Sequence, residues 1–409
     1  MKALVLAGGF PQIALIEELK SRNIETALAD YNENPVARKY ADKFYQVSTL
    51  DIDAIRQLAV CEKVDFLITA CTDQALLTVA KVSEDLSLPC YIDYQTARNV
   101  TNKQYMKKVF CENGISTAKH VSLAALSEDA VKDMEYPLIV KPADCNSSKG
   151  VKKVRNEEEL KEAFADAVNF SRTNTAIVEE FVEGEEITVD VQVENGKAHV
   201  LSMAYSDKIA ADDKFVIYRT RYPISESKEV IEQIKTTAQQ IADAFKLKNS
   251  LMLIQMISNG KKVFVLEFSA RTGGGVKYLL IKKVSGFDVI SAAVDLTLQN
   301  PPHVEIKAPE SKFITNLFIY CDKGKFDTLS GFEELKADGV ISDYYLFKWR
   351  GAEMTGVENS GDRIAGITVQ ADTYEELQNK YNIAKDRMKV LDTDGNDIMR
   401  HDLIKPLIY

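Results

Sequence analysis

One strand-like segment carries a carboxylate among apolar side chains. Glu267 lies in the segment 263–268, where the other residues are apolar. A carboxylate buried in such a strand is costly unless it is protonated, paired or bound to a cation. The turn at Asn259-Gly260 predicts a hairpin that places Gln255 opposite Glu267. With Ser269 further along the strand, the segment predicts an oxygen-rich site, or else a Glu267 side chain paired with a lysine or arginine.

A second segment ends an apolar strand with a cation. Lys141 closes the strand 138–141, which makes it either a solvated strand end or a fixed charge for an anion. The loop 143–150 favours the anion, because its small residues let backbone N–H groups approach a phosphate. The further donors of this loop are Ser147, Ser148 and Lys149. Carboxylates beside phosphate-binding lysines suit Mg²⁺.

The acidic segment 177–186 runs from a strand through a turn into another strand. The backbone of such a linker can present N–H and C=O groups to the edge of an adenine. An acidic side chain one turn later can accept hydrogen bonds from both ribose hydroxyls. The alternative is a solvated acidic turn, which describes most runs of this kind.

A glycine turn follows the first strand, where a dinucleotide-binding fold would place its phosphate loop. Gly8 and Gly9 are present, but Pro11 and Gln12 replace the later glycines of that fingerprint. Asp30 ends the second strand, where a ribose-binding acid would lie. A tight turn in a parallel sheet is the interpretation we prefer over a site for NAD.

The composition restricts the class of protein. A chain of 409 residues predicts two to four domains, and 45% hydrophobic with 27% charged residues is typical of a soluble globular protein. No apolar run approaches the roughly 20 residues that span a bilayer, and the short apolar start reads as a strand rather than a signal peptide. A net charge of −10 without a basic block argues against a nucleic-acid partner. Six scattered cysteines and four isolated histidines predict no zinc site and suit free thiols in a reducing cytosol.

The order of the predicted elements indicates a mixed architecture. Strands and helices alternate over the first ninety residues, from 3–6 to a short strand at 89–92, which predicts a parallel sheet covered by helices. A helix at 102–113 follows. The later strands favour antiparallel pairing, and the pairs Asp207-Lys208 and Arg219–Arg221 are placed between them. Pro301-Pro302 marks a boundary before an α+β tail of roughly a hundred residues.

These segments, in this order, resemble the ATP-grasp superfamily over residues 1 to about 300. The motifs that carry the resemblance are Asn34-Pro35, Tyr40-Ala41-Asp42, Thr72-Asp73, 101–107 and 267–275, the last being similar to carboxylate–amine ligases that include amino-acid ligases. The resemblance implies an α/β and α+β multidomain ATP-grasp fold with a Rossmann-like pre-ATP-grasp domain. The implied units are the pre-ATP-grasp domain (1–95), a connecting helix (96–114), a lid (115–182), a large antiparallel lobe (183–305) and a C-terminal α+β domain (306–409).

The resemblance also implies roles for single residues. Lys103 and Lys141 match lysines that bind ATP phosphates, and Lys141, Glu267 and Arg271 would be catalytic, with Arg271 holding the reacting carboxyl or phosphate. The implied ATP-binding residues also include Ser147, Ser148, Lys149, Glu179, Glu180, Phe181, Val182 and Glu186. The implied ligands of Mg²⁺ (or Mn²⁺) are Glu267, Gln255 and Ser269. The expected substrate contacts are Lys208, Arg221, Gly274 and Arg363.

Three departures from the family pattern bear on the metal and phosphate sites. Gln255 stands where many members have an acid, and Ser269 where many have asparagine. Both are weaker metal ligands, so one Mg²⁺ at Glu267 is expected and a second is in doubt. The phosphate loop also has a single glycine, Gly150.

The expected reaction is ATP-dependent ligation. A carboxylate attacks ATP to give an acyl phosphate and ADP, and an amine then forms an amide with release of phosphate. One alternative is a carboxylase or a purine-pathway enzyme, similar to phosphoribosylglycinamide synthetase or carbamoyl-phosphate synthase. Another is a nucleotide-binding regulator without catalysis. The expected partners are small-molecule carboxylates and amines in the cytoplasm, with no nucleic acid and no membrane, and a homodimer is the commonest assembly.

Overall fold

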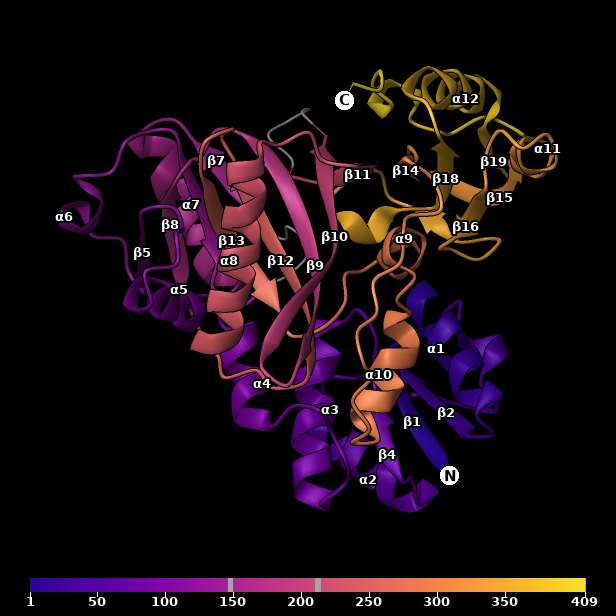
Figure 1. The fold of residues 1–409 in the computed structure, drawn as a ribbon, viewed down its shortest axis with the longest axis horizontal. Helices are drawn as coiled ribbons and strands as arrows, with labels where there is room; N and C mark the ends of the chain where they lie inside the picture. Colours follow the sequence, from indigo (N-terminus) through magenta and orange to yellow (C-terminus); the bar gives the residue numbers. More distant parts are fainter. Residues whose placement is uncertain (146–149, 210–214, 409) are drawn as a thin grey trace.

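The computed structural model describes residues 1–145, 150–209 and 215–408 (Figure 1). Four parallel strands at the start of the chain form a sheet in the order β3-β2-β1-β4. These strands are β1 (Lys2–Leu6), β2 (Glu25–Asp30), β3 (Lys43–Gln46) and β4 (Phe66–Ile68). The helices of this unit are α1 (Phe10–Ser21), α2 (Ile52–Glu62), α3 (Asp73–Leu86) and the 3₁₀ turn η1 (Arg38–Tyr40).

Helices cover both faces of this parallel sheet, which explains why β4 and all of β1 except Lys2 are apolar. Ala3 and Val5 pack with α1 and with the distant helix α10 (Val289–Thr297), whereas Leu4 and Leu6 pack with α2 and α3. The carboxylate of Asp30 accepts the backbone N–H of Gly8 at 2.7 Å. Asp30 therefore holds the tight turn that we preferred over a dinucleotide site.

The segment 89–92 is a loop, so the strand expected there is wrong. The carbonyl of Cys90 accepts a hydrogen bond from the side chain of Gln299 at 2.7 Å, and the hydroxyl of Tyr91 donates to the carbonyl of Ala270 at 2.9 Å. Its apolar residues pack against distant segments, and this tertiary packing takes the place of strand pairing.

Two helices lead to a second, antiparallel sheet. Helix α4 (Tyr94–Thr101) is capped by the Asp93 side chain and α5 (Lys103–Glu112) by that of Asn102. The second sheet, named the lid sheet here, has the order β5-β8-β6-β7. Its strands are β5 (His120–Leu123), β6 (Leu138–Pro142), β7 (Lys152–Val154) and β8 (Ala176–Glu180), and its helices are α6 (Glu128–Val131) and α7 (Glu157–Phe170). Helix α7 packs on one face of this sheet.

An eight-stranded antiparallel sheet, the large sheet, forms the centre of the molecule in the order β13-β12-β9-β10-β11-β14-β18-β16. Its first five strands are β9 (Glu185–Glu194), β10 (Lys197–Lys208), β11 (Ile217–Tyr222), β12 (Ser250–Ser258) and β13 (Val263–Ser269). Helix α8 (Lys228–Ala244) packs on the apolar side of β9, and α9 (Lys277–Ser285) follows β13. Asp207-Lys208 and Arg219–Arg221 belong to β10 and β11, so their expected placement between strands is wrong.

The large sheet continues beyond residue 305, where the sequence predicted a boundary. Its last three strands are β14 (Phe313–Ile319), β16 (Asp343–Leu346) and β18 (Ala365–Ala371). A three-stranded sheet consists of β15 (Gly324–Ser330), β17 (Glu353–Met354) and β19 (Lys389–Asp392). The helices of this region are α11 (Phe332–Ala337), α12 (Tyr374–Arg387), η3 (Ser360–Asp362) and η4 (His401–Leu403). Among the described residues, no helix is long and apolar enough to cross a membrane.

Candidate active site

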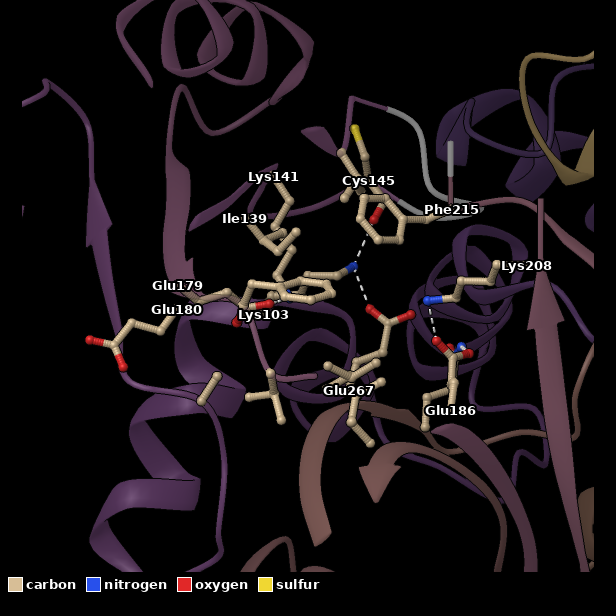
Figure 2. A pocket seen from close by; sticks show the side chains of 17 residues that line it. Lys103, Ile139, Lys141, Cys145, Glu179, Glu180, Glu186, Lys208, Phe215 and Glu267 are labelled. Atoms are coloured by element: carbon tan, nitrogen blue, oxygen red, sulfur yellow. Dashed lines mark hydrogen bonds and ion pairs between the residues drawn. The ribbon is translucent and has the colours of Figure 1, made fainter. Parts of the chain in front are cut away.

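A cavity of about 130 Å³ lies between the lid sheet and the large sheet, and Figure 2 shows the side chains that line it. The predicted site residues that line it are Lys103, Lys141, Glu179, Glu180, Phe181, Val182, Glu186, Lys208, Gln255 and Glu267. They come from α5, both sheets and the connection between β8 and β9, so folding gathers segments that are far apart in the sequence.

Lys103 and Glu267 form an ion pair at the centre of the cavity (Figure 2). The Lys103 ammonium lies 2.9 Å from Glu267 Oε2 and donates to the carbonyl of Cys145 at 2.7 Å. Burial raises the pKa of Glu267, but the charges of Lys103 and Lys141 outweigh burial and lower the pKa below its ordinary value. The Glu267 side chain is 32% exposed, not buried as its strand suggested, because it faces the cavity. Its carboxylate is therefore ionised and accessible.

Lys141 lies on β6 and forms a short ion pair with Glu179 on the neighbouring strand β8. The other carboxylate oxygen of Glu179 lies 3.0 Å from the ammonium of Lys107 on α5. Burial raises the pKa of Glu179, but the two lysines outweigh it and lower the pKa to about 2. One ionised carboxylate thus lies between two ammonium groups at the wall of the cavity.

Glu186, at the start of β9, has a partner for each carboxylate oxygen. Gln255 donates its side-chain N–H to Glu186 Oε1 at 3.0 Å, and Lys208 forms a short ion pair with Oε2. Gln255 also pairs with Glu267 in the ladder between β12 and β13, which confirms the predicted hairpin register. The amide of Gln255 therefore contacts Glu186, one of the expected ATP-binding residues, rather than completing a cluster of carboxylates.

A bulge in β13 adds an apolar wall to the cavity. Gln255 pairs with Glu267 but Met256 pairs with Val265, which leaves Leu266 as the extra residue. Both Leu266 and Glu267 consequently line the cavity. Sequence reasoning missed the other members of this lining, which are Ala118, Ile139, Cys145, Val151, Phe215 and Ile257. Strand alternation offered a signal for Ile139, two residues before Lys141, and for Ile257, two residues after Gln255.

Five predicted site residues lie outside the cavity lining: Ser269, Arg271, Gly274, Arg221 and Arg363. Arg271 donates through Nε to Asp73 Oδ1 at 2.7 Å and through Nη2 to Asp73 Oδ2, and Ser269 also bonds to Asp73. Burial lowers the pKa of Arg271, but the carboxylate of Asp73 outweighs burial and raises it. Asp73 begins α3, so the N-terminal unit fixes this arginine. The predicted phosphate contacts Ser147, Ser148 and Lys149 fall outside the described residues.

The two remaining arginines contact the C-terminal part of the chain. Arg363 stacks on Phe318, with its guanidinium carbon 3.7 Å from the ring centroid, and donates to the Tyr320 hydroxyl at 3.0 Å. A Cβ added at Gly275 would lie 3.3 Å from Arg363 Nη1, so this side chain borders the glycine segment after Arg271. Arg221 pairs with Asp207 and donates to the carbonyl of Ile408 at 2.6 Å.

Several cations of the site are already paired with carboxylates. The pairs are Lys103–Glu267, Lys141–Glu179, Lys208–Glu186 and Arg271–Asp73. An anion that enters the cavity must therefore displace one or more of these carboxylates from its cation, or bind the N–H groups of the cations that the carboxylates do not occupy.

Comparisons with known proteins agree on one fold. Residues 103–273 match the family described as D-ala D-ala ligase C-terminus. The solved structure of L-amino acid ligase from Bacillus licheniformis superimposes with a TM-score of 0.79 at 21% identity, covering 96% of this chain and 99% of that one. A match of this extent shows that the two chains share their fold.

Two curated relatives match this chain in sequence. The carbamoyl phosphate synthase large chain of Clostridium acetobutylicum is 23% identical over 83% of this chain, which spans only 32% of that protein. The formate-dependent phosphoribosylglycinamide formyltransferase of Methanocaldococcus jannaschii is 25% identical over 72% of this chain and 76% of its own length. The chain thus spans about a third of one relative and three quarters of the other.

Proposed function

Because this chain has the ATP-grasp fold and matches a ligase family over residues 103–273, we propose that it is an ATP-dependent ligase that joins a carboxylate to an amine. The observation that carries the proposal is the grouping of Lys103, Lys141 and Glu267 in one cavity between two sheets. Two cations and a carboxylate in a partly enclosed space suit a magnesium–phosphate ligand better than an uncharged one.

The nucleotide would occupy the cavity between the lid sheet and the large sheet. The apolar side chains of Ile139 and Leu266 line it from opposite sheets, which suits the faces of an adenine ring. The backbone of 180–182 would read the edge of the ring, and Glu186 would accept from the ribose hydroxyls. Because Lys208 and Gln255 hold Glu186 here, ribose binding would have to displace Lys208 or share its carboxylate with it.

The phosphates would lie against Lys103 and Lys141, with Ser147, Ser148 and Lys149 as further donors. A phosphate that takes the ammonium of Lys103 frees the carboxylate of Glu267 from its ion pair with that lysine. Glu267 would then hold Mg²⁺, which supplies charge neutralisation on the phosphate oxygens. Gln255 contacts Glu186 and Ser269 contacts Asp73, so we propose one magnesium rather than two.

The proposed reaction has two steps. A carboxylate oxygen of the first substrate forms a bond to the γ-phosphorus while the bond from that phosphorus to ADP breaks. The amine nitrogen of the second substrate then attacks the acyl carbon, inorganic phosphate leaves, and the nitrogen loses a proton to solvent. The chain contributes mainly orientation and positive charge, as is usual in phosphoryl transfer.

Arg271 is proposed to hold the reacting carboxyl or the acyl phosphate. Asp73 binds its Nε and Nη2 atoms, which fixes the plane of the guanidinium and leaves the group cationic. Arg363 borders the glycine segment that follows Arg271, and we propose that Arg363 and Gly274 contact the acceptor. Lys208 faces the cavity and Arg221 faces the C-terminal segment, so of these two Lys208 is the better placed to reach a substrate.

The experiment that tests the proposal is a screen for release of ADP and phosphate over pairs of carboxylates and amines. Formate and bicarbonate belong in the screen, because the relatives include a formate-dependent enzyme and a carbamoyl phosphate synthase. Hydroxylamine in place of the amine should trap the acyl phosphate as a hydroxamate. ATP binding without turnover for any pair would favour the non-catalytic regulator instead, and stabilisation by NAD but not by Mg–ATP would refute the proposal.

A further inference from the structure

Lys107 is a buried cation that does not line the cavity. It lies one turn after Lys103 on α5, and its side chain is only 1% exposed. Its ammonium contacts Glu179 Oε2 at 3.0 Å, donates to the Thr117 hydroxyl at 2.5 Å, and lies 3.4 Å from the carbonyl of Val265. An isolated buried ammonium is costly. Burial lowers the pKa of Lys107 below its ordinary value, and the charge of Glu179 opposes that shift.

Lys107, Glu179 and Lys141 form a row of three buried charges. The side chains of Glu179 and Lys141 are 4% and 9% exposed, and the two oxygens of Glu179 face one lysine each. Two ammonium groups and one carboxylate leave a net charge of +1. Lys141 and Glu179 line the cavity, whereas Lys107 does not, because Thr117 and β13 cover it.

The charge of Lys107 changes what Lys141 can offer to an anion. With Glu179 alone, Lys141 would form a neutral pair, and the carboxylate beside it would repel a phosphate. With Lys107 on the far oxygen, Glu179 is already compensated, and the positive charge of Lys141 remains for a ligand. Because the dielectric constant is low in a buried site, one unit of charge changes the interaction energy with a phosphate substantially.

We propose that Lys107 is a positioning residue for the phosphate site, which neutralises Glu179 so that Lys141 keeps its charge for the nucleotide. The inference rests on the proposed function only in taking ATP as the ligand. Lys107 also connects the two sheets, because it contacts Glu179 on the lid strand β8 and the carbonyl of Val265 on β13 of the large sheet. Thr117, whose hydroxyl donates to that carbonyl at 2.7 Å, completes this link.

The test compares the binding of Mg–ATP and of adenosine, which lacks phosphates, to variants of the full chain. Lys107→Met should weaken Mg–ATP binding at least tenfold and leave adenosine binding within about twofold. The matched control is Lys108→Met, because Lys108 is the next residue on α5 but is 68% exposed and pairs with the exposed Glu112. This control should bind both ligands like the unmodified chain.

A double variant separates charge from packing. Lys107→Met with Glu179→Gln removes one charge of each sign and restores the net charge of +1, so it should regain most of the Mg–ATP affinity that Lys107→Met loses. If Lys107→Met alone does not fold, the Mg–ATP affinity of the double variant still tests the inference. An equal loss of ATP and adenosine binding, unchanged ATP binding in Lys107→Met, or no recovery in the double variant would each overturn the inference. Failure of the unmodified chain to bind Mg–ATP would instead overturn the proposed function.

Discussion

The carboxylate of Glu267 should make nucleotide binding depend on magnesium, and the variant Glu267→Gln isolates this effect. In the free protein Glu267 is compensated by Lys103 at 2.9 Å. When phosphates take Lys103, the carboxylate faces like charge unless a cation joins it. Glu267→Gln removes that repulsion together with the candidate metal ligand. We therefore expect the variant to bind ATP more tightly than the unmodified chain in EDTA, and to gain little when Mg²⁺ is added.

The size of the effect follows from the geometry. Two unit charges about 4 Å apart interact by about 4 kcal/mol at an effective dielectric constant of 20. Roughly a third of the Glu267 side chain is exposed (32%), so solvent screening reduces this to about 2 kcal/mol. That free energy corresponds to a roughly thirtyfold change in dissociation constant.

Isothermal titration calorimetry measures the dissociation constant of ATP in EDTA and again in excess Mg²⁺. Glu183→Gln is the matched control, because Glu183 is exposed near the same cavity without lining it and carries the same charge. Glu183→Gln should retain the full magnesium dependence. The reasoning is refuted if Glu267→Gln retains that dependence too, or if it binds ATP in EDTA no better than the unmodified chain.

Three further expectations concern stability, pH and motion. Asp73→Asn removes the carboxylate partner of a largely buried Arg271, so the free energy of unfolding in urea should fall by about 3 kcal/mol, and a loss below about 1 kcal/mol would contradict the importance of this contact. The pKa of Glu179 in the folded chain is lowered to about 2, so its contribution to stability is present above its ordinary pKa near 4.5 and is lost as the pH falls from about 5 toward 2. Urea titrations should show the free energy of unfolding decreasing over this pH range, and Glu179→Gln should reduce that decrease. The lid, 115–182, should gain protection from hydrogen exchange when Mg–ATP binds, and equal exchange with and without the nucleotide would argue against lid closure.

Local patterns predicted the parts of the site that one hairpin or one strand end determines. The Asn259-Gly260 turn indicates that β12 pairs with β13 as a hairpin and brings Gln255 close to Glu267, although their direct opposition also depends on the bulge at Leu266. The position of Lys141 at the end of an apolar strand was equally local. These features depend on the alternation of side chains along a strand, which short sequences encode well.

Pairings between distant segments could not be predicted in this way. Asp73 and Arg271 are 198 residues apart, and nothing in either segment indicates the other. The contact of Glu179 with Lys141 depends on β8 lying beside β6 in the lid sheet, which is a property of sheet order rather than of sequence pattern. Strand β11 was missed because charged residues alternate along 217–222 and resemble a surface loop, whereas Arg219 and Arg221 are buried against Asp207.

The continuity of the large sheet past residue 305 bears on how this chain can be divided or recombined. Strand β11 pairs with β14 over four residues, from Arg219 opposite Leu317 to Tyr222 opposite Ile314. A chain cut before β14 would leave β11 as an open edge, which invites pairing with another molecule. An exchange of C-terminal regions between relatives would therefore be better made at a surface turn beyond β18 than at Pro301-Pro302, although the latter looks like a linker in the sequence.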